Sequence, residues 1–188
     1  MRILVACATP WELKTVKTQI KSLNFKKSLD IIYLTTGIGN YETIYSLTNY
    51  LAQNDCSEIL LLNIWIWWYW GFRKEEQEKY LQIWRIKNVS TGKELLVPIP
   101  FEFWKITSIY SSEKALYTPP CDEEKGYVDM EARAIEYCAD KFRIPRLIIK
   151  IPYDRIGEET KNFDKQEACR KLAENLDYWQ LLEKLLSL

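Results

Sequence analysis

The sequence predicts an α/β fold, in which a β-sheet is flanked by helices within one domain over residues 1–188. Short apolar runs that are typical of buried strands alternate with segments whose apolar residues recur every three or four positions, as in amphipathic helices. A chain of 188 residues is long enough to bury a sizeable core without a second domain. The alternation of the two patterns favours strands and helices packed together in layers.

The first part of the chain contains three predicted strands and two predicted helices. The strands cover residues 2–8, 30–35 and 58–64, and the helices cover 11–23 and the stretch from the turn at 36–40 to 53. Further along, residues 80–88, 95–98 and 104–109 are predicted as short strands, with a hairpin signal at 90–92. These elements make up the larger share of the expected sheet.

The last part of the chain joins a helix to a buried strand. Residues 132–142 have a helical apolar face, and Pro145 ends the helix because the residue before a proline avoids the α region. Residues 147–151 are aliphatic except for Lys150, and they are predicted as a strand covered on both faces. Asp154 is expected just past the carboxyl end of this strand, where α/β sheets bind ligands.

The C-terminal stretch 166–188 is strongly amphipathic and is predicted as one helix or a helix pair. Its expected buried face consists of Leu172, Leu176, Trp179, Leu182 and Leu186. A stripe of this kind is typical of core packing rather than of a cofactor site.

The composition excludes several classes of function. Lys plus Arg equals Asp plus Glu at 26 each, so no net field recruits nucleic acid or an anionic membrane. No apolar run has the length of a membrane span, and the five cysteines lack metal-ligand spacing, which together favour a cytoplasmic protein. Histidine is absent, so carboxylates must do any acid and base work. We predict no metal site, no cofactor, and partners that are small molecules or proteins.

Glu12 has two interpretations. Thr9, Pro10 and Glu12 have the spacing of a capping box at the start of the first helix, which makes Glu12 a capping carboxylate. The second interpretation, a catalytic group, comes from the resemblance described below. The pattern alone favours capping.

The turn Gly37-Ile38-Gly39 follows the second strand and opens the second helix. Glycines at such a turn let backbone N–H groups approach a ligand and aim the helix N-terminus at it. The same pattern also describes an ordinary tight turn. Glu131, at the start of the helix 132–142, similarly suits either a ligand or the helix dipole, and Asp154 suits either a site or a polar turn.

The order of these motifs resembles the nucleoside phosphorylase and nucleosidase superfamily. The segments VDMEARAIEYCADKFRIP and IIKIPYD are similar to its Met-Glu helix and its strand followed by Asp, and ATPWEL is similar to the opening of futalosine hydrolases. The branch that cleaves methylthioadenosine, adenosylhomocysteine or futalosine is the most similar. The resemblance implies a three-layer sandwich with a central mixed β-sheet flanked by helices, as in phosphorylases and hydrolases of this superfamily.

The resemblance also implies roles for individual residues. Glu12 would activate the attacking water and Asp154 would protonate the leaving purine, while Glu131 and Met130 would contact the ribose. The turn at Gly37, Ile38 and Gly39 would line the water or phosphate side of the site. With no arginine near this turn, hydrolysis is favoured over phosphorolysis.

A tryptophan-rich tract departs from this pattern. Where the superfamily has small residues against the ribose and base, this chain has residues 63–71, NIWIWWYWG, which keep Asn63 and Gly71 but place indoles between them. An indole buries about 150 to 250 Å², so Trp67 and Trp68 are expected to line and narrow the substrate site. Strand alternation predicts that Trp65 and Trp67 share one face and Trp68 the other.

Two hypotheses of function follow. The first is a nucleosidase that hydrolyses the N-glycosidic bond of a purine-type nucleoside, with turnover impaired by the tryptophans. The alternative is a remodelled scaffold, natural or engineered, whose aromatic surface binds a ligand or a protein without catalysis. A homodimer is expected in either case, from the resemblance and from the apolar surplus in residues 80–110.

Overall fold

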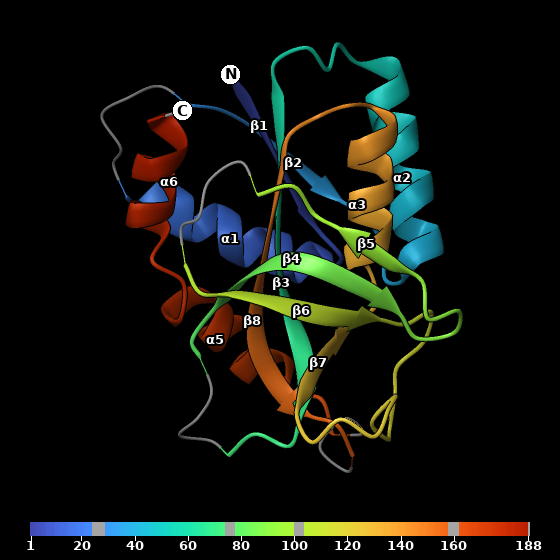
Figure 1. Cartoon of the computed structure of the whole chain (residues 1–188). Coiled ribbons are helices and arrows are strands. Elements are labelled where there is room, and N and C mark those ends of the chain that lie inside the picture. Colours follow the sequence, from blue (N-terminus) through green and yellow to red (C-terminus); the bar gives the residue numbers. More distant parts are fainter. Residues whose placement is uncertain (24–28, 74–77, 100–103, 158–161, 188) are drawn as a thin grey trace.

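The computed structural model describes residues 1–23, 29–73, 78–99, 104–157 and 162–187 and contains a β-sheet with helices packed on it (Figure 1). Its strands are β1 (Arg2–Cys7), β2 (Asp30–Thr35), β3 (Ile59–Trp70), β4 (Leu81–Asn88), β5 (Glu94–Leu96), β6 (Ile106–Ser111), β7 (Gly126–Asp129) and β8 (Arg146–Arg155). Its helices are α1 (Pro10–Ser22), α2 (Asn40–Gln53), α3 (Ala132–Lys141), α5 (Lys165–Glu174) and α6 (Tyr178–Leu186).

The eight strands form one mixed sheet that closes on itself at one end. β2, β1, β3 and β8 are parallel neighbours, whereas β7 runs antiparallel to β3. β3 pairs with β7, β7 with β6, β6 with β4, β4 with β8, and β8 with β3, which completes a ring of five strands. Closure leaves few unpaired strand edges in this half of the sheet.

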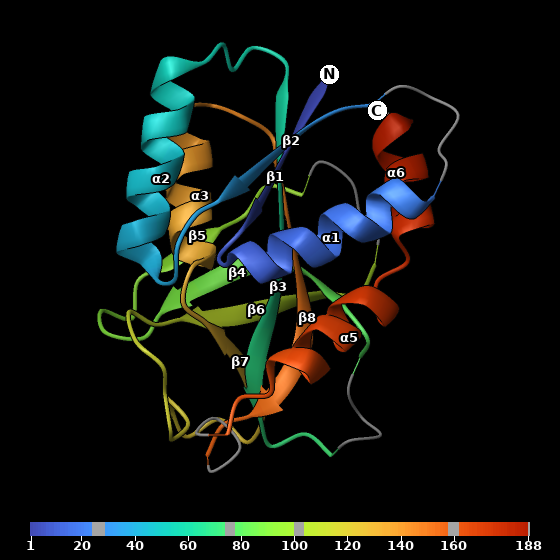
Figure 2. The same cartoon turned by 180° about the vertical axis from the view of Figure 1, so that it is seen from behind.

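Helices cover both faces of the sheet, and each face has its own core. α2 and α3 lie side by side on one flank, and α1, α5 and α6 lie on the other (Figure 1, Figure 2). Buried residues of β1, β3 and β8 pack on α1, α5 and α6, and a second cluster joins the sheet to α2 and α3. The predicted three-layer α/β sandwich with a central mixed sheet is confirmed.

Two strands are longer than expected, and this moves a candidate residue. β3 continues through the whole tryptophan tract to Trp70, and β8 continues to Arg155 alongside it. Asp154 therefore lies inside β8, so the expectation that it follows the strand in a turn is wrong. Trp68 and Tyr69 at the end of β3 pair with Asp154 and Arg155, so the last residues of β8 remain in the sheet.

A bulge in β8 lies where this pairing shifts. Trp67 pairs with Pro152 and Trp68 with Asp154, which leaves Tyr153 as the extra residue. Pro152 has no N–H to donate and lies beyond the segment of β8 that pairs with β4, so its position at a bulge is compatible with the sheet. Bulges of this kind redirect side chains.

The C-terminal stretch is a helix pair, the second of the two arrangements that the sequence allowed. Asp164 caps α5 and Asp177 caps α6. Because the helix is interrupted between them, α6 does not bury the face that one continuous helix would bury. The buried face of α6 is made by Tyr178, Leu181, Leu182 and Leu185. Trp179 is 45% exposed, so its predicted place in the core is wrong. No helix of the described residues is long and apolar enough to cross a membrane.

Candidate functional site

A cavity of about 220 Å³ lies where β3 and β8 meet the starts of α1 and α3 and the turn before α2. Its walls are mostly aromatic and contain two carboxylates. The described residues that line it are Thr9, Trp11, Glu12, Ile38, Trp65, Ile66, Trp67, Trp68, Ala115, Glu131, Tyr153 and Phe163. The volume is below the range of about 300 to 1,000 Å³ that is typical of small-molecule pockets.

Glu12 is both a capping residue and a wall of this cavity. Its Oε2 accepts hydrogen bonds from the Thr9 N–H at 2.9 Å and the Thr9 hydroxyl at 2.7 Å, which completes the capping box of α1. Its other oxygen, Oε1, has no hydrogen-bond partner among the described residues. Burial raises the pKa of Glu12 from 4.5 to about 7, although the Thr9 hydrogen bonds and the charge of Lys150 oppose the rise. The two interpretations of Glu12 are therefore compatible.

Glu131 reaches away from its own helix to the start of α2. It occupies the N-cap position of α3, but its side chain caps nothing there. The N–H groups of Ala132 and Ala134 in α3 instead donate to the side-chain oxygens of Asp129 and Asn40. The Glu131 Oε1 accepts a hydrogen bond from the Gly39 N–H at 2.6 Å. Since the side chain does not cap α3, the dipole of that helix does not explain its position. The side chain is held instead by the N–H of Gly39 at the start of α2, and it lines the cavity.

The electrostatic setting of Glu131 favours a proton. Burial and the neighbouring charge of Asp129 raise its pKa well above the usual range, while Lys150 and the Gly39 N–H act in the opposite direction. The charge of Glu12 adds a smaller rise. The two cavity carboxylates thus influence each other and share one nearby cation.

That cation, Lys150, was not identified as a site residue from the sequence. It is fully buried, forms an ion pair with Asp129 at 2.7 Å, and lies 4.9 Å from the centre of the Trp65 ring. The signal was present: a lysine inside a strand predicted to be covered on both faces needs a buried partner. Asp129, two residues before Glu131, is that partner.

The turn between β2 and α2 has the conformation that glycine permits. Gly37 and Gly39 have φ values of +86° and +92°, which side chains with a Cβ rarely adopt. A Cβ on Gly37 would approach the Cβ of Glu42 to 2.6 Å. Ile38 lines the cavity and is 59% exposed, so it forms part of the cavity mouth.

The tryptophans lie at the cavity as well as in the core. Trp65, Trp67 and Trp68 all line it, and Trp67 is 1% exposed, with its ring stacked on Tyr127 at 4.2 Å. Trp68 is half-buried. Indoles therefore line the same cavity as Glu131, and the cavity that remains is small rather than absent.

Five expected site residues are not among the described residues that line the cavity: Gly37, Gly39, Asn63, Met130 and Asp154. Asn63 is buried in β3 and donates a hydrogen bond to the carbonyl of Ala6 at 3.0 Å, so it joins β3 to β1. Met130 lies beside Gly39. Asp154 is half-buried in β8, opposite Trp68 in the pairing.

Other cavity residues had no sequence signal of their own. Trp11 follows the Thr9-Pro10 cap, and its ring lies 5.8 Å from that of Phe163. Tyr153, the bulged residue of β8, lies 5.3 Å from the same ring and donates its hydroxyl hydrogen to the Asp164 carbonyl. The bulge explains why alternation along β8 did not indicate Tyr153. No group of three His, Cys, Asp or Glu side chains in the described residues is arranged to hold a metal ion.

Comparison with solved structures identifies the same architecture in nucleosidases. Helicobacter pylori 5'-methylthioadenosine/S-adenosylhomocysteine nucleosidase with 5'-methylthioadenosine in its active site matches with a TM-score of 0.77 at 11% identity, covering 100% of this chain and 99% of that one. A Borrelia burgdorferi protein described as a putative nucleosidase of the same kind, bound to adenine, matches at 0.74 and 15% identity over 97% and 99%. A futalosine hydrolase mutant of Helicobacter pylori matches at 0.76 and 10% identity over 100% of both chains.

No protein-family model and no curated protein sequence matches this chain. The likeness is therefore one of structure, at 10 to 21% identity in the neighbours considered. The resemblance inferred from the motifs is confirmed at that level. The chain has the fold of the 5'-methylthioadenosine/S-adenosylhomocysteine nucleosidases and futalosine hydrolase.

Proposed function

We propose that this protein is a nucleosidase-like hydrolase that cleaves the N-glycosidic bond of a purine-type nucleoside, with its activity restricted by the tryptophans. The observation that carries the proposal is that Glu12 and Glu131 line one cavity. Neighbours of the same fold hold adenine or 5'-methylthioadenosine, which supports a purine-type ligand.

Glu12 acts as the base. It takes a proton from water, the water oxygen bonds to C1′ of the sugar, and the electrons of the broken C1′–N bond leave with the purine. A general base works best with a pKa near the operating pH, and the pKa of about 7 at Glu12 meets this condition. Oε1, the oxygen that is not used in the capping box, is the atom that receives the proton.

Glu131 acts on the sugar. Its carboxylate accepts hydrogen bonds from the ribose hydroxyls and stabilises the positive charge that develops on the sugar in the transition state. Burial and the charge of Asp129 raise the pKa of Glu131 well above its usual range. This role therefore needs the positive charge that develops on the sugar to favour the ionised form, and Lys150 and the Gly39 N–H act in the same direction. Met130 packs beside the sugar at the Gly39 turn.

Asp154 supplies the proton for the leaving purine in this proposal. A carboxylic acid that donates near neutral pH needs a raised pKa, which burial by a bound purine would provide. Asp154 pairs with Trp68 on β3, and Trp68 lines the cavity, so Asp154 lies next to a wall of the cavity in the sheet.

Water is the favoured nucleophile over phosphate. The N-terminus of a helix is a natural anion site, but at α2 the Gly39 N–H is already bonded to Glu131. No arginine or lysine is found among the described residues that line the cavity. Both carboxylates that act on the water and the sugar are in these walls, whereas no cationic group for phosphate is found among the described lining residues.

The test is release of free base, followed by chromatography, from 5'-methylthioadenosine, S-adenosylhomocysteine, adenosine and inosine. The proposal expects slow release that disappears in Glu12→Gln. Glu183→Gln changes an exposed carboxylate on α6 and serves as the matched control. Equal rates in the Glu12→Gln protein and the unmodified protein would refute the assignment of the base.

An aromatic binding site without catalysis is the second candidate. Four indoles and two other aromatic rings line the cavity, from Trp11, Trp65, Trp67, Trp68, Tyr153 and Phe163, which favours a flat aromatic ligand. Calorimetry with adenine separates the candidates. Saturable binding without base release from any nucleoside supports this second function over the first.

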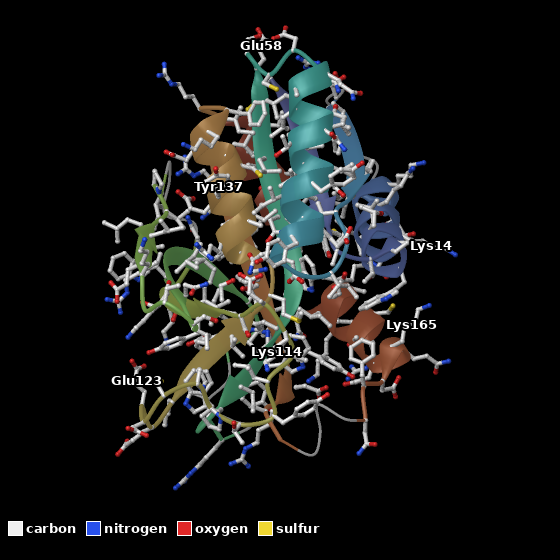
Figure 3. All side chains as sticks on the ribbon, turned by 90° about the vertical axis from the view of Figure 1, so that its right-hand side faces the viewer. Lys14, Glu58, Lys114, Glu123, Tyr137 and Lys165 are labelled. Carbon is white, nitrogen blue, oxygen red and sulfur yellow. The ribbon has the colours of Figure 1, made fainter. Side chains whose placement is uncertain are left out.

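We also propose a homodimer, for which exposed aromatic residues of α2 and α3 provide a surface. Tyr41 and Tyr45 of α2 are 77% and 68% exposed. Tyr137 of α3, which is labelled in Figure 3, is 49% exposed. Within the described part of residues 80–110, only Leu96 and Ile106 are large exposed apolar residues, so that region supplies less surface than the sequence suggested. A strictly monomeric species in sedimentation at about 10 μM would contradict the dimer.

A further inference from the structure

Trp67 is the most deeply buried of the tryptophans that line the cavity of the candidate site. Its side chain is 1% exposed, compared with 6% for Trp65. Its indole nitrogen has no hydrogen-bond partner among the described residues. Trp70, three residues later, instead donates its indole hydrogen to the Glu123 carbonyl at 3.0 Å. The Trp67 indole is therefore held by packing rather than by a polar anchor.

This packing is a stack of three aromatic rings. The Tyr127 ring lies parallel to the Trp67 ring, with 4.2 Å between their centres and 1° between their planes. Phe72 stacks on Tyr127 at 4.7 Å, with an angle of 20° between the rings. Two rings at these distances cannot share one face of the phenol, so Tyr127 lies between Trp67 and Phe72. Tyr127 thus supports the indole, and Phe72 supports Tyr127.

Strand register explains why these rings meet. β7 runs antiparallel to β3, and Tyr127 lies directly opposite Tyr69 (Figure 1). Trp67 is two residues from Tyr69 on β3 and so points to the same face of the sheet. It is therefore a diagonal neighbour of Tyr127, at a separation that aromatic side chains can bridge. The contact follows from the pairing of two strands rather than from a loop.

The two strands also approach closely at the residue before Tyr127. Trp70 pairs with Gly126, and a Cβ on this glycine would lie 2.2 Å from the Trp70 ring. The Trp70 indole thus occupies the space that a side chain at position 126 would need. Because the hydrogen bond of Trp70 to the Glu123 carbonyl holds this indole in place, the backbone that carries Tyr127 is fixed against β3.

We propose that Tyr127 is a positioning residue, which holds the Trp67 indole in the cavity wall and thereby restricts the binding of a nucleoside. The inference rests on the function proposed above, which makes this cavity the nucleoside site. The cavity of about 220 Å³ is smaller than typical small-molecule pockets, so a nucleoside needs part of the wall to move. Trp68 is half-buried, whereas Trp67 can move only by breaking its stack with Tyr127.

Calorimetry with adenine and 5'-methylthioadenosine tests the proposal in Tyr127→Leu and Tyr127→Phe. Leucine is apolar but cannot stack, so 5'-methylthioadenosine should bind about two- to tenfold more tightly, the range that corresponds to the loss of one aromatic pair. Adenine is smaller and should gain less. Tyr127→Phe keeps the ring and should bind both ligands as the unmodified protein does. Burial raises the pKa of Tyr127 to about 12, so neither substitution removes a charge near neutral pH.

Fluorine NMR of protein labelled with 5-fluorotryptophan gives a readout that needs no nucleoside. The Trp67 signal is the one that is missing from Trp67→Phe. Because a stacked ring shifts the signal of its neighbour, this signal should move more in Tyr127→Leu than in Tyr127→Phe. The control is Tyr178→Leu, which removes a buried ring from α6 that is not among the described lining residues. It should leave both the signal and the nucleoside affinity unchanged.

Each outcome decides the question. Unchanged or weaker nucleoside binding by Tyr127→Leu, an equal gain in Tyr127→Phe or Tyr178→Leu, or an unmoved Trp67 signal would each overturn the proposal. Base release is measured on the same proteins. Release without a gain in Tyr127→Leu refutes only the positioning role, whereas tighter binding without release in any variant refutes only the hydrolysis.

A second variant covers the case in which Tyr127→Leu does not fold. Phe72→Leu removes the ring on the far side of Tyr127, and Phe72 is only half-buried. The stack is then weakened rather than lost, so we expect a smaller gain in nucleoside affinity in the same direction. No gain in Phe72→Leu would overturn the proposal.

Discussion

Glu12→Gln should change how the stability of the protein depends on pH. Burial raises the pKa of Glu12 from 4.5 to about 7, so between these values the folded protein binds a proton that the unfolded chain releases. Stability therefore falls as the pH rises through this interval. Each pKa unit corresponds to about 1.36 kcal/mol, which makes the full effect about 3 kcal/mol.

Glutamine removes this effect while leaving the local structure intact. Its side-chain oxygen can accept the Thr9 N–H, as glutamine does in other capping boxes. The free energy of unfolding of Glu12→Gln, relative to the unmodified protein, should thus rise by about 3 kcal/mol between pH 4.5 and pH 8.

Urea unfolding at pH 4.5, 6, 7 and 8, followed by circular dichroism, measures this difference. Glu183→Gln changes an exposed carboxylate and should give a nearly constant difference across the series. A difference for Glu12→Gln that stays flat within about 0.5 kcal/mol, or that falls with pH, would refute the argument from burial.

Three further changes test the site and its support. Trp68→Ala should widen the cavity and lower the free energy of unfolding only modestly, because Trp68 is half-buried. Trp67→Ala should lower the free energy of unfolding by about 3 to 5 kcal/mol because Trp67 is 1% exposed. Urea unfolding measures both losses of stability, and calorimetry measures any gain in nucleoside affinity. Lys150→Met should lower the free energy of unfolding by about 3 to 5 kcal/mol because it leaves Asp129 buried without its ion pair. Adding Asp129→Asn to the same protein should recover part of this loss in a double-mutant cycle. Additive losses from the two substitutions would contradict the coupling. Gly37→Ala should cost about 1 to 3 kcal/mol because its φ is +86°, and an unchanged thermal midpoint would show that the turn can adopt another conformation.

Local patterns were sufficient where a residue's neighbours in sequence decide its position. The capping box of α1 and the positive φ values of the glycine turn follow from a few adjacent residues, and the structure has both. The central helix α3 and its preceding acidic residue were also placed correctly in the chain. These features needed no knowledge of distant contacts.

Long-range pairing decided the features that the sequence did not indicate. Asp154 lies inside β8 because the tryptophan tract extends β3 beside it, and Tyr153 lines the cavity because a bulge interrupts the alternation. The partner of Glu131 is Gly39, which lies 92 positions away, and no local pattern indicates that contact. Trp179 is exposed because the chain breaks between α5 and α6.

The central claim is that the cavity carboxylates hydrolyse a nucleoside and that the tryptophans restrict this reaction. Its most direct test is release of adenine from 5'-methylthioadenosine by Trp68→Ala, measured beside the unmodified protein and the double variant Trp68→Ala with Glu12→Gln. The account predicts slow release by the unmodified protein, faster release by Trp68→Ala, and none by the double variant. Absence of release from the Trp68→Ala protein, or release that persists without the Glu12 carboxylate, would contradict it.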